Sequence, residues 1–177
     1  MKRSISLIGM AGAGKSSLGK KIATRLDYNF VDSDSIIEAQ QNMSLQKVLE
    51  RNGVDKFKMI EEQVLLSVDF NQTILATGGS AIFCKSAMSY IKQNSSVIYI
   101  KTPYEKIVER VSDFSNRGFI KSNNQTVQEA FKEREIIYKD FADHIVENKD
   151  ELEACMVLDK VGAETVWETQ KLERYRK

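Results

Sequence analysis

The sequence predicts an α/β fold of three layers, in which helices cover both faces of a central, mainly parallel five-stranded sheet. Three observations predict it. Five short apolar runs alternate along the chain with segments of helical spacing. The runs are nearly continuously apolar, which is typical of strands buried on both faces of a parallel sheet. A glycine-rich loop joins the first run to the first helical segment.

The five predicted strands are each rich in β-branched or aromatic residues and end at glycine, aspartate or other polar residues. They are residues 5–8, 30–31, 73–76, 97–100 and 144–146. Residues 69–72 and 93–96 carry Asp, Asn, Gln and Ser between such elements, and we expect turns there.

The predicted helices separate the strands and show apolar residues at three- and four-residue spacing. They are residues 15–26, 35–51, 55–67, 84–93, 103–112, 125–140 and 149–169. Pro103 suits a first helical turn, where its missing N–H needs no partner.

Residues 112–124 form a polar segment between two predicted helices. A loop of this length in a compact domain is usually a functional flap, with a disordered segment as the alternative. We expect a lid at about 112–124. No repeat or linker interrupts the chain, so residues 1–177 are predicted to form a single domain.

Composition argues against partners that are bound by bulk charge. The 26 Lys and Arg residues nearly balance the 25 Asp and Glu residues, so we expect neither a nucleic acid nor a membrane surface as partner. Cys84 and Cys155 match no metal or redox spacing. The apolar run near the N-terminus stops at glycines after a few residues, too short for a signal peptide or a membrane span. We expect a cytoplasmic protein.

The glycine-rich loop, residues 9–16, fits G-x-x-x-x-G-K-[ST] at every fixed position. Backbone N–H groups of such a loop point at phosphate oxygens, and the following helix adds the positive end of its dipole. Lys15 is expected to reach the β- and γ-phosphates of ATP, and Ser16 to ligate Mg²⁺. A tight turn with an incidental Lys-Ser pair is the alternative, but the strand before the motif and the helix after it favour a P-loop NTPase fold. The expected nucleotide contacts are Gly12, Ala13, Gly14, Lys15, Ser16 and Ser17.

Asp32 and Asp34 follow the second predicted strand. Side chains two residues apart on a strand point the same way, so both could face the phosphates beyond the strand end. One carboxylate can then support Mg²⁺ while the other orients the hydroxyl to be phosphorylated. The alternative is a helix cap before Ser35, which could occupy one of the two aspartates.

From about residue 4 to residue 146 the chain resembles the shikimate kinase family, small P-loop kinases of the nucleoside-monophosphate-kinase type. The motifs that carry the resemblance keep the order and spacing of that family. They are residues 9–16, 30–34, 53–61 and 76–80, Arg110 with Arg117, and residues 134–138 with Ala142 and Asp143.

The resemblance implies phosphorylation by ATP of a hydroxyl on a small anionic metabolite, with shikimate to shikimate 3-phosphate, in the route to aromatic amino acids, as the reaction. It implies that Asp34 contacts the acceptor hydroxyl as its base, that Asp32 supports Mg²⁺, and that Lys15 and the lid residue Arg117 are catalytic. Arg110 would flank the nucleotide. The protein would need ATP and Mg²⁺, and we expect a monomer.

The acceptor would lie against Gly78 and Gly79, with its carboxylate paired to Arg134, and a helical segment at about 33–61 would take part in binding it. Gly78 and Gly79 follow a predicted strand, and their bare backbone allows close approach. For Arg134, which has charged neighbours on its predicted helix, a solvated ion pair is the alternative. Tyr138 is expected to be core packing.

The chain departs from the family pattern on the acceptor and lid sides. Val54 and Lys58 stand where the family has Glu and Arg, and Ser80 replaces the third glycine of Gly-Gly-Gly. Lys58 keeps a positive charge but loses the planar fork that binds a carboxylate through two bonds. Glu61, one helical turn later, is expected to hold Lys58 in place. In the lid, Gly118 replaces a proline after Arg117.

These departures leave alternatives open. A related kinase for a different hydroxylated acid or polyol is one, and a nucleotide-binding regulatory protein that has lost acceptor activity is another. No guanine-recognition motif of the Asn-Lys-x-Asp kind occurs, which disfavours a GTPase. Residues 164–177 are highly charged and are expected to extend the last helix along the surface.

Overall fold

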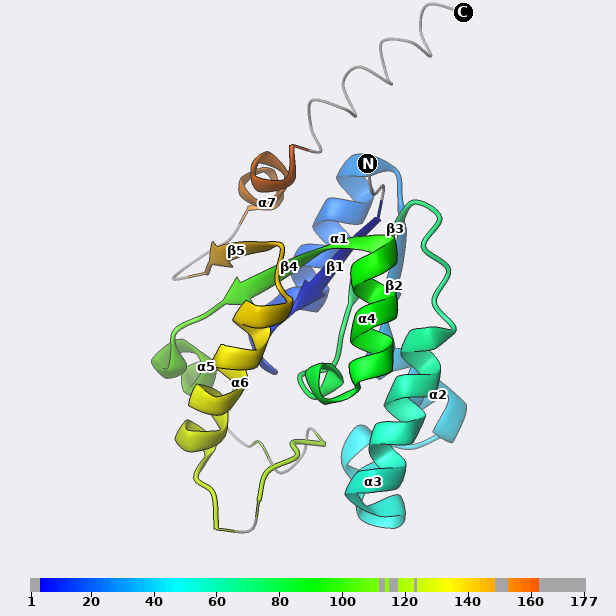
Figure 1. The fold of residues 1–177 in the computed structure, drawn as a ribbon, viewed down its shortest axis with the longest axis vertical. Helices are drawn as coiled ribbons and strands as arrows, with labels where there is room; N and C mark the ends of the chain where they lie inside the picture. The colour runs from blue at the N-terminus through cyan, green and yellow to red at the C-terminus, as the bar shows by residue number, and fades with distance from the viewer. Residues whose placement is uncertain (1–3, 112–113, 115–117, 123, 149–152, 163–177) are drawn as a thin grey trace, which may run out of the picture.

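The computed structural model describes all residues except 1–3, 112–113, 115–117, 123, 149–152 and 163–177. Its centre is a five-stranded sheet in the order β2-β3-β1-β4-β5, in which all four strand pairs are parallel (Figure 1). The sheet is therefore wholly rather than mainly parallel. The strands are β1 (Ser4–Ile8), β2 (Asn29–Asp32), β3 (Thr73–Ala76), β4 (Ser95–Lys101) and β5 (His144–Glu147).

Helices cover both faces of the sheet, as the sequence predicts. On one face α1 packs against the sheet and α7; on the other lie α4 and α6, with α3 packed beside α4 (Figure 1). The helices are α1 (Lys15–Leu26), α2 (Ser33–Gln41), α3 (Leu45–Leu66), α4 (Lys85–Asn94), α5 (Tyr104–Arg110), α6 (Val127–Phe141) and α7 (Ala154–Val161), with a short 3₁₀ turn at Ala81–Phe83.

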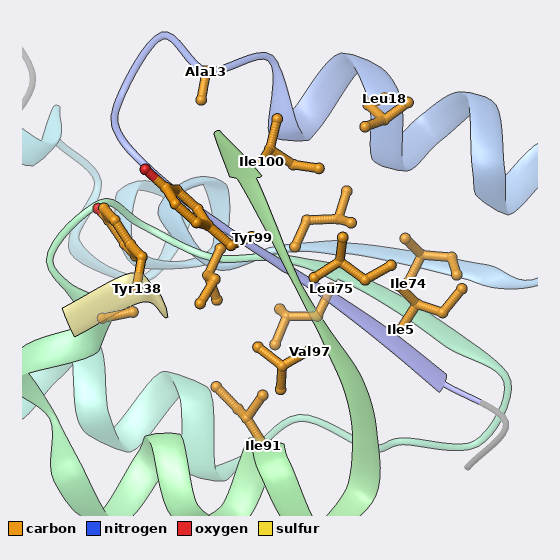
Figure 2. Close-up of a cluster of buried hydrophobic side chains, with 14 of the residues drawn as sticks. Ile5, Ala13, Leu18, Ile74, Leu75, Ile91, Val97, Tyr99, Ile100 and Tyr138 are labelled. Atoms are coloured by element: carbon orange, nitrogen blue, oxygen red, sulfur yellow. The ribbon is translucent and has the colours of Figure 1, made fainter. Parts of the chain in front are cut away.

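The main hydrophobic core lies on both sides of the central strands. Every residue of β1 and β3 is buried, which explains why these strands are nearly continuously apolar. Part of the core, including Leu75 of β3, Ile91 of α4 and Val97 of β4, is drawn in Figure 2. This core makes the carboxyl ends of the strands a rigid platform for the residues that follow them.

A second, smaller core holds α2 and α3 together. It is built around Ile37 of α2 and Val48, Phe57 and Val64 of α3, with Ile120 packed against it. α3 is broken at Gly53, whose φ of 73° and ψ of 171° are not helical. Helices α2 and α3 thus form a pair that packs around its own core beside the sheet.

Several predicted boundaries differ from the structure. The helix predicted at 35–51 is interrupted at Asn42, which ends α2 in the left-handed conformation, and Ser44 precedes α3. The turn predicted at 93–96 is wrong, because α4 runs to Asn94 and β4 begins at Ser95. The helix predicted at 149–169 is described only as α7, and the predicted extension at 164–177 lies outside the described residues.

Among the helices that the structure describes, none has both the length and the apolar character needed to cross a membrane.

Candidate functional site

A cavity of about 760 Å³ opens beyond the carboxyl ends of the parallel strands, where ligands bind in open α/β sheets. One part, here called the P-loop end, is lined by Gly12, Gly14, Lys15, Ser16, Ser17 and Arg110. The other part, here called the α6 end, is lined by Asp34, Phe57, Gly79, Ser80, Phe119 and Arg134. Asp32 lines the same cavity. The structure thus brings two groups of predicted residues into one space.

The loop between β1 and α1 has the curvature of a phosphate cradle because two of its glycines are left-handed. Gly12 has a φ of 82° and Gly14 a φ of 92°. A Cβ on Gly12 would lie 2.5 Å from Cγ2 of Val111, so a side chain there would be strained and blocked. The N-terminus of α1, without an acidic residue in its first turn, borders the cavity. An anion at this end meets backbone N–H groups and the positive helix end.

Lys15 lies folded over this loop. Its ammonium donates hydrogen bonds of 2.8 Å to the carbonyl oxygens of Gly9 and Met10, and its side chain is buried. Because the side chain also lines the cavity, its charge is held at the place where phosphate oxygens would enter.

Ala13 belongs to the same loop, but its side chain is buried and does not line the cavity. Its N–H donates to the Met10 carbonyl, and its own carbonyl accepts from the Thr102 hydroxyl at 3.3 Å and from Nδ2 of Asn148 at 3.0 Å. Sequence reasoning missed Thr102 and Asn148. Each directly follows a strand, β4 or β5, and a polar residue at that position is the signal that could have identified them.

Asp32 and Asp34 both line the cavity, but not for the predicted reason. Asp32 is the last residue of β2 and caps α2, its Oδ1 accepting from the N–H groups of Asp34 at 3.1 Å and Ser35 at 3.3 Å. Asp34 therefore lies in the first turn of α2 and not on a strand. The prediction that Asp32 and Asp34 point the same way because they alternate along a strand is wrong. The capping alternative holds for Asp32.

Gly78 lies between two carboxylates at the α6 end. Its N–H donates to the Ser33 hydroxyl at 2.9 Å. A Cβ on Gly78 would lie 2.5 Å from Oδ1 of Asp34 and 2.5 Å from Oε1 of Glu61. Glycine at this position is what allows the two carboxylates to approach each other.

Glu61 is almost fully buried, with 1% of its surface exposed, and Oε2 accepts a 2.8 Å hydrogen bond from the Ser80 hydroxyl. The pKa of Glu61 is raised to about 7, chiefly by burial and also by the charge of Asp34, while the Ser80 hydrogen bond and the charges of Arg134 and Lys58 act to lower it. The predicted partner of Glu61, Lys58, has its ammonium 5.1 Å from the centre of the Phe83 ring and is not among the residues that line the cavity.

Arg134 is 2% exposed, which excludes the solvated ion pair considered for it. Its guanidinium donates to the carbonyl oxygens of Gly79 and Ile120 and lies 4.2 Å from the centre of the Phe119 ring. Burial lowers the pKa of Arg134, yet an arginine remains charged at neutral pH. A buried cation that lines a cavity is suited to binding an anionic group.

Tyr138, predicted as core packing, is fully buried and stacks on Tyr99 with ring centres 5.0 Å apart (Figure 2). Its hydroxyl also donates a 2.6 Å hydrogen bond to the Gly79 carbonyl. The side chain thus packs in the core and at the same time fixes the backbone of a residue that lines the cavity.

The structure brings most of the predicted site residues together. Ala13, Lys58 and Gly78 do not line the cavity, and Arg117 lies outside the described residues. In the described part of the chain, no three His, Cys, Asp or Glu side chains are grouped so as to hold a metal ion. Ser16 and Asp32 line the cavity together, a pair of oxygen donors that fits Mg²⁺ held jointly with the phosphates of a nucleotide.

Comparison with known proteins identifies a family. The family model described as shikimate kinase matches residues 11–165. A shikimate kinase of Pseudoalteromonas translucida is 33% identical over 164 residues, covering 90% of this chain and 95% of that protein. A shikimate kinase of Haemophilus influenzae is 31% identical over 164 residues, covering 90% of this chain and 91% of that protein.

Solved structures agree with this result. The shikimate kinase of Acinetobacter baumannii in complex with shikimate has a TM-score of 0.75 and 28% sequence identity, covering 98% of this chain and 94% of that one. The shikimate kinase of Aquifex aeolicus has a TM-score of 0.77 and 24% identity, covering 93% of this chain and 99% of that one, and supports the fold.

Proposed function

The chain belongs to the shikimate kinase family, and from that premise we propose that it transfers the γ-phosphoryl group of ATP to a hydroxyl of shikimate, giving shikimate 3-phosphate for aromatic amino-acid synthesis. The observation that carries the proposal is the single cavity that joins a P-loop to a buried arginine. The P-loop end suits a polyphosphate, and the α6 end suits a small molecule that bears a carboxylate and hydroxyl groups.

The P-loop end binds ATP in this proposal. Backbone N–H groups of residues 12–17 surround the phosphates, and Lys15 moves its ammonium from the loop carbonyls to the β- and γ-phosphates. Ser16 and Asp32 would hold Mg²⁺, which neutralises phosphate charge when bound. Arg110 flanks the nucleotide, and Arg117 adds positive charge from the lid.

The α6 end binds the acceptor. Arg134 pairs with the acceptor carboxylate, and the backbone of Gly79, held by Tyr138, supports the ring. Asp34 accepts the proton of the hydroxyl that attacks the γ-phosphorus. Gly78 and Ser80 shape the floor of the acceptor site. Lys58, whose ammonium lies over the Phe83 ring, adds positive charge nearby.

We propose that residues 1–177 act as one domain, with a lid at about 112–124 and an acceptor-binding segment at about 33–61. The separate small core of α2 and α3 supports that segment. The near-zero net charge of +1 supports a small molecule as partner and gives no reason to expect nucleic acid or a membrane. We further propose a cytoplasmic monomer.

The test is an ADP-release assay with ATP and Mg²⁺ across a panel of acceptors: shikimate, quinate, gluconate, homoserine and nucleoside monophosphates. We expect saturable turnover with shikimate and much less with the others. A preference for another hydroxylated acid would support the alternative of a related kinase, which the Ser80 hydroxyl at the cavity favours. ATP binding without turnover of any acceptor would support the regulatory alternative.

A further inference from the structure

The hydroxyl of Ser80 makes a contact that glycine could not make. Its Oγ donates a 2.8 Å hydrogen bond to Oε2 of Glu61. Both residues are more than nine-tenths buried, with 6% of Ser80 and 1% of Glu61 exposed. Ser80 also lines the cavity beside Gly79 and Arg134, so the hydrogen bond joins the cavity floor to a carboxyl group of α3.

The groups that face Glu61 come from every element packed around it. Asp34 of α2 approaches it across Gly78, and Lys58 of α3 and Arg134 of α6 supply positive charge. Cys84, before α4, and Tyr138 of α6 stay neutral because burial raises the pKa of both side chains. With both carboxylates ionised, two positive and two negative charges cancel. Protonation of Glu61 leaves one positive charge in excess.

We propose that Ser80 is a positioning residue for the acceptor: its hydroxyl holds the buried Glu61 carboxyl directly behind the floor of the α6 end, where the charge of Glu61 controls how tightly an anionic acceptor binds. The proposal rests on the proposed function in one respect, namely that the acceptor is an anion. Beyond shaping the floor, the Ser80 hydroxyl then acts through Glu61, and one proton on Glu61 takes part in the recognition of that anion.

The sign of the effect follows from electrostatics. A pKa of about 7 leaves both forms of Glu61 populated near neutrality, and an anionic acceptor binds the protonated form more tightly. Acceptor binding therefore takes up a proton, and the acceptor KM rises as the pH rises through the pKa of Glu61. The Ser80 hydrogen bond stabilises the ionised form, so its removal raises that pKa.

The first measurement is the KM for shikimate, with kcat recorded separately, from pH 6 to pH 8.5 at saturating ATP. If the acceptor raises the pKa of Glu61 by about one unit, the wild-type KM rises by up to about tenfold across this range. In Ser80→Ala the rise moves to higher pH by up to about one unit. In Glu61→Gln, and in Glu61→Gln combined with Ser80→Ala, KM is independent of pH.

Ser67→Ala is the matched control. Ser67 also donates its hydroxyl to a group of α3, the Val64 carbonyl, but it does not line the cavity. Its KM profile should superpose on that of the wild type. Superposed profiles of wild type and Ser80→Ala, or an undiminished rise in Glu61→Gln, would overturn the proposal.

A second measurement does not depend on the acceptor. The full chain, labelled with ¹³C at the glutamate carboxyl carbons, is titrated by NMR, and the Glu61 signal is identified by its loss in Glu61→Gln. We expect a midpoint near neutrality in the wild type and a higher one in Ser80→Ala. Equal midpoints would overturn the role of Ser80 whatever the acceptor is. Absence of shikimate turnover together with unequal midpoints would instead contradict the proposed function and support the role of Ser80.

Discussion

At the scale of single residues, the cavity depends on charged side chains whose positions are set by backbone groups. Lys15 is held by two carbonyls of the P-loop, and Arg134 by carbonyls of Gly79 and Ile120. These contacts keep both cations beside the cavity before any anion arrives, so that Lys15 has only to turn its ammonium from the loop carbonyls to the phosphates. Preorganised charge of this kind is effective in phosphoryl transfer because little reorganisation remains for the transition state.

Lys15→Ala should abolish phosphoryl transfer, lowering kcat/KM for ATP by about three orders of magnitude or more, in the range found when a charged group that stabilises the transition state is lost. The measurement is the ADP-release assay, with circular dichroism to confirm that the fold is retained. Lys21→Ala, on the exposed side of α1, is the control and should keep wild-type turnover. Turnover of Lys15→Ala like that of the wild type would exclude the assigned nucleotide site.

The stability of the fold should also depend on the ionisation of Glu61. Its pKa is raised in the folded state, from 4.5 to about 7, so its contribution to stability is fully present below pH 4.5 and is lost as the pH rises to about 7. Between pH 5 and pH 8 the free energy of unfolding of the wild type should fall relative to that of Glu61→Gln, by up to about 3 kcal/mol. Urea unfolding at both pH values measures this, and parallel pH dependence of the two proteins would contradict the burial-raised pKa.

At the scale of elements, the pair α2 and α3 shows how local breaks shape one wall of the cavity. Asn42 ends α2 in a left-handed conformation, and Gly53 bends α3 with a φ of 73°. The two breaks let three helical pieces fold around one small core. That core carries Asp34, Phe57 and Glu61 to the cavity or its floor.

Gly53→Ala tests the bend directly. A Cβ there would meet nothing within 4 Å, so the substitution changes only the backbone preference. We expect a loss of about 1–3 kcal/mol in the free energy of unfolding, because a φ of 73° with a ψ of 171° lies in a region that residues with a Cβ rarely adopt. Gly162→Ala is the control for stability, because Gly162 also has a positive φ and open space around it. Gly162 lies at the end of α7, away from the bend, so this substitution should leave the acceptor KM unchanged. An unchanged or increased stability of Gly53→Ala would show that the bend is not maintained.

At the scale of the whole molecule, the sheet brings together residues that are far apart in the sequence. Asn148 and Thr102, after β5 and β4, hold the carbonyl of Ala13 in the P-loop, 135 and 89 residues away. The parallel arrangement makes this contact available, since all carboxyl ends lie at one edge. The backbone of the P-loop is therefore held by residues that follow β4 and β5 as well as by β1, which precedes it.

Mg·ADP at about 100 times its Kd should stabilise the chain by about 2.7 kcal/mol, which corresponds to a rise in Tm of about 5–10 °C for a domain of this size. Thermal unfolding followed by far-ultraviolet circular dichroism measures the rise in Tm. Lys15→Ala should show a much smaller one. Equal shifts in both proteins would place the nucleotide elsewhere.

Much of this architecture could be predicted because local chemistry carries it. The five strands were predicted within two residues at each end, since buried parallel strands need continuous apolar runs, and the P-loop needs glycines at positions with positive φ. The break at Gly53 was predicted as well. The break at Asn42 was missed, although Asn followed closely by Ser is a signal for the end of one helix and the start of another.

The sequence by itself determined the three-layer fold, the P-loop and the resemblance to shikimate kinases, because each is carried by short motifs whose own residues are close together in the chain. Only the tertiary structure decided that Arg134 is buried, and that the Glu61 carboxyl is bonded by Ser80 while the Lys58 ammonium lies over the Phe83 ring. Those facts depend on which side chains meet across the sheet edge and how much water they lose there. Neither packing nor desolvation is a property of any single stretch of sequence.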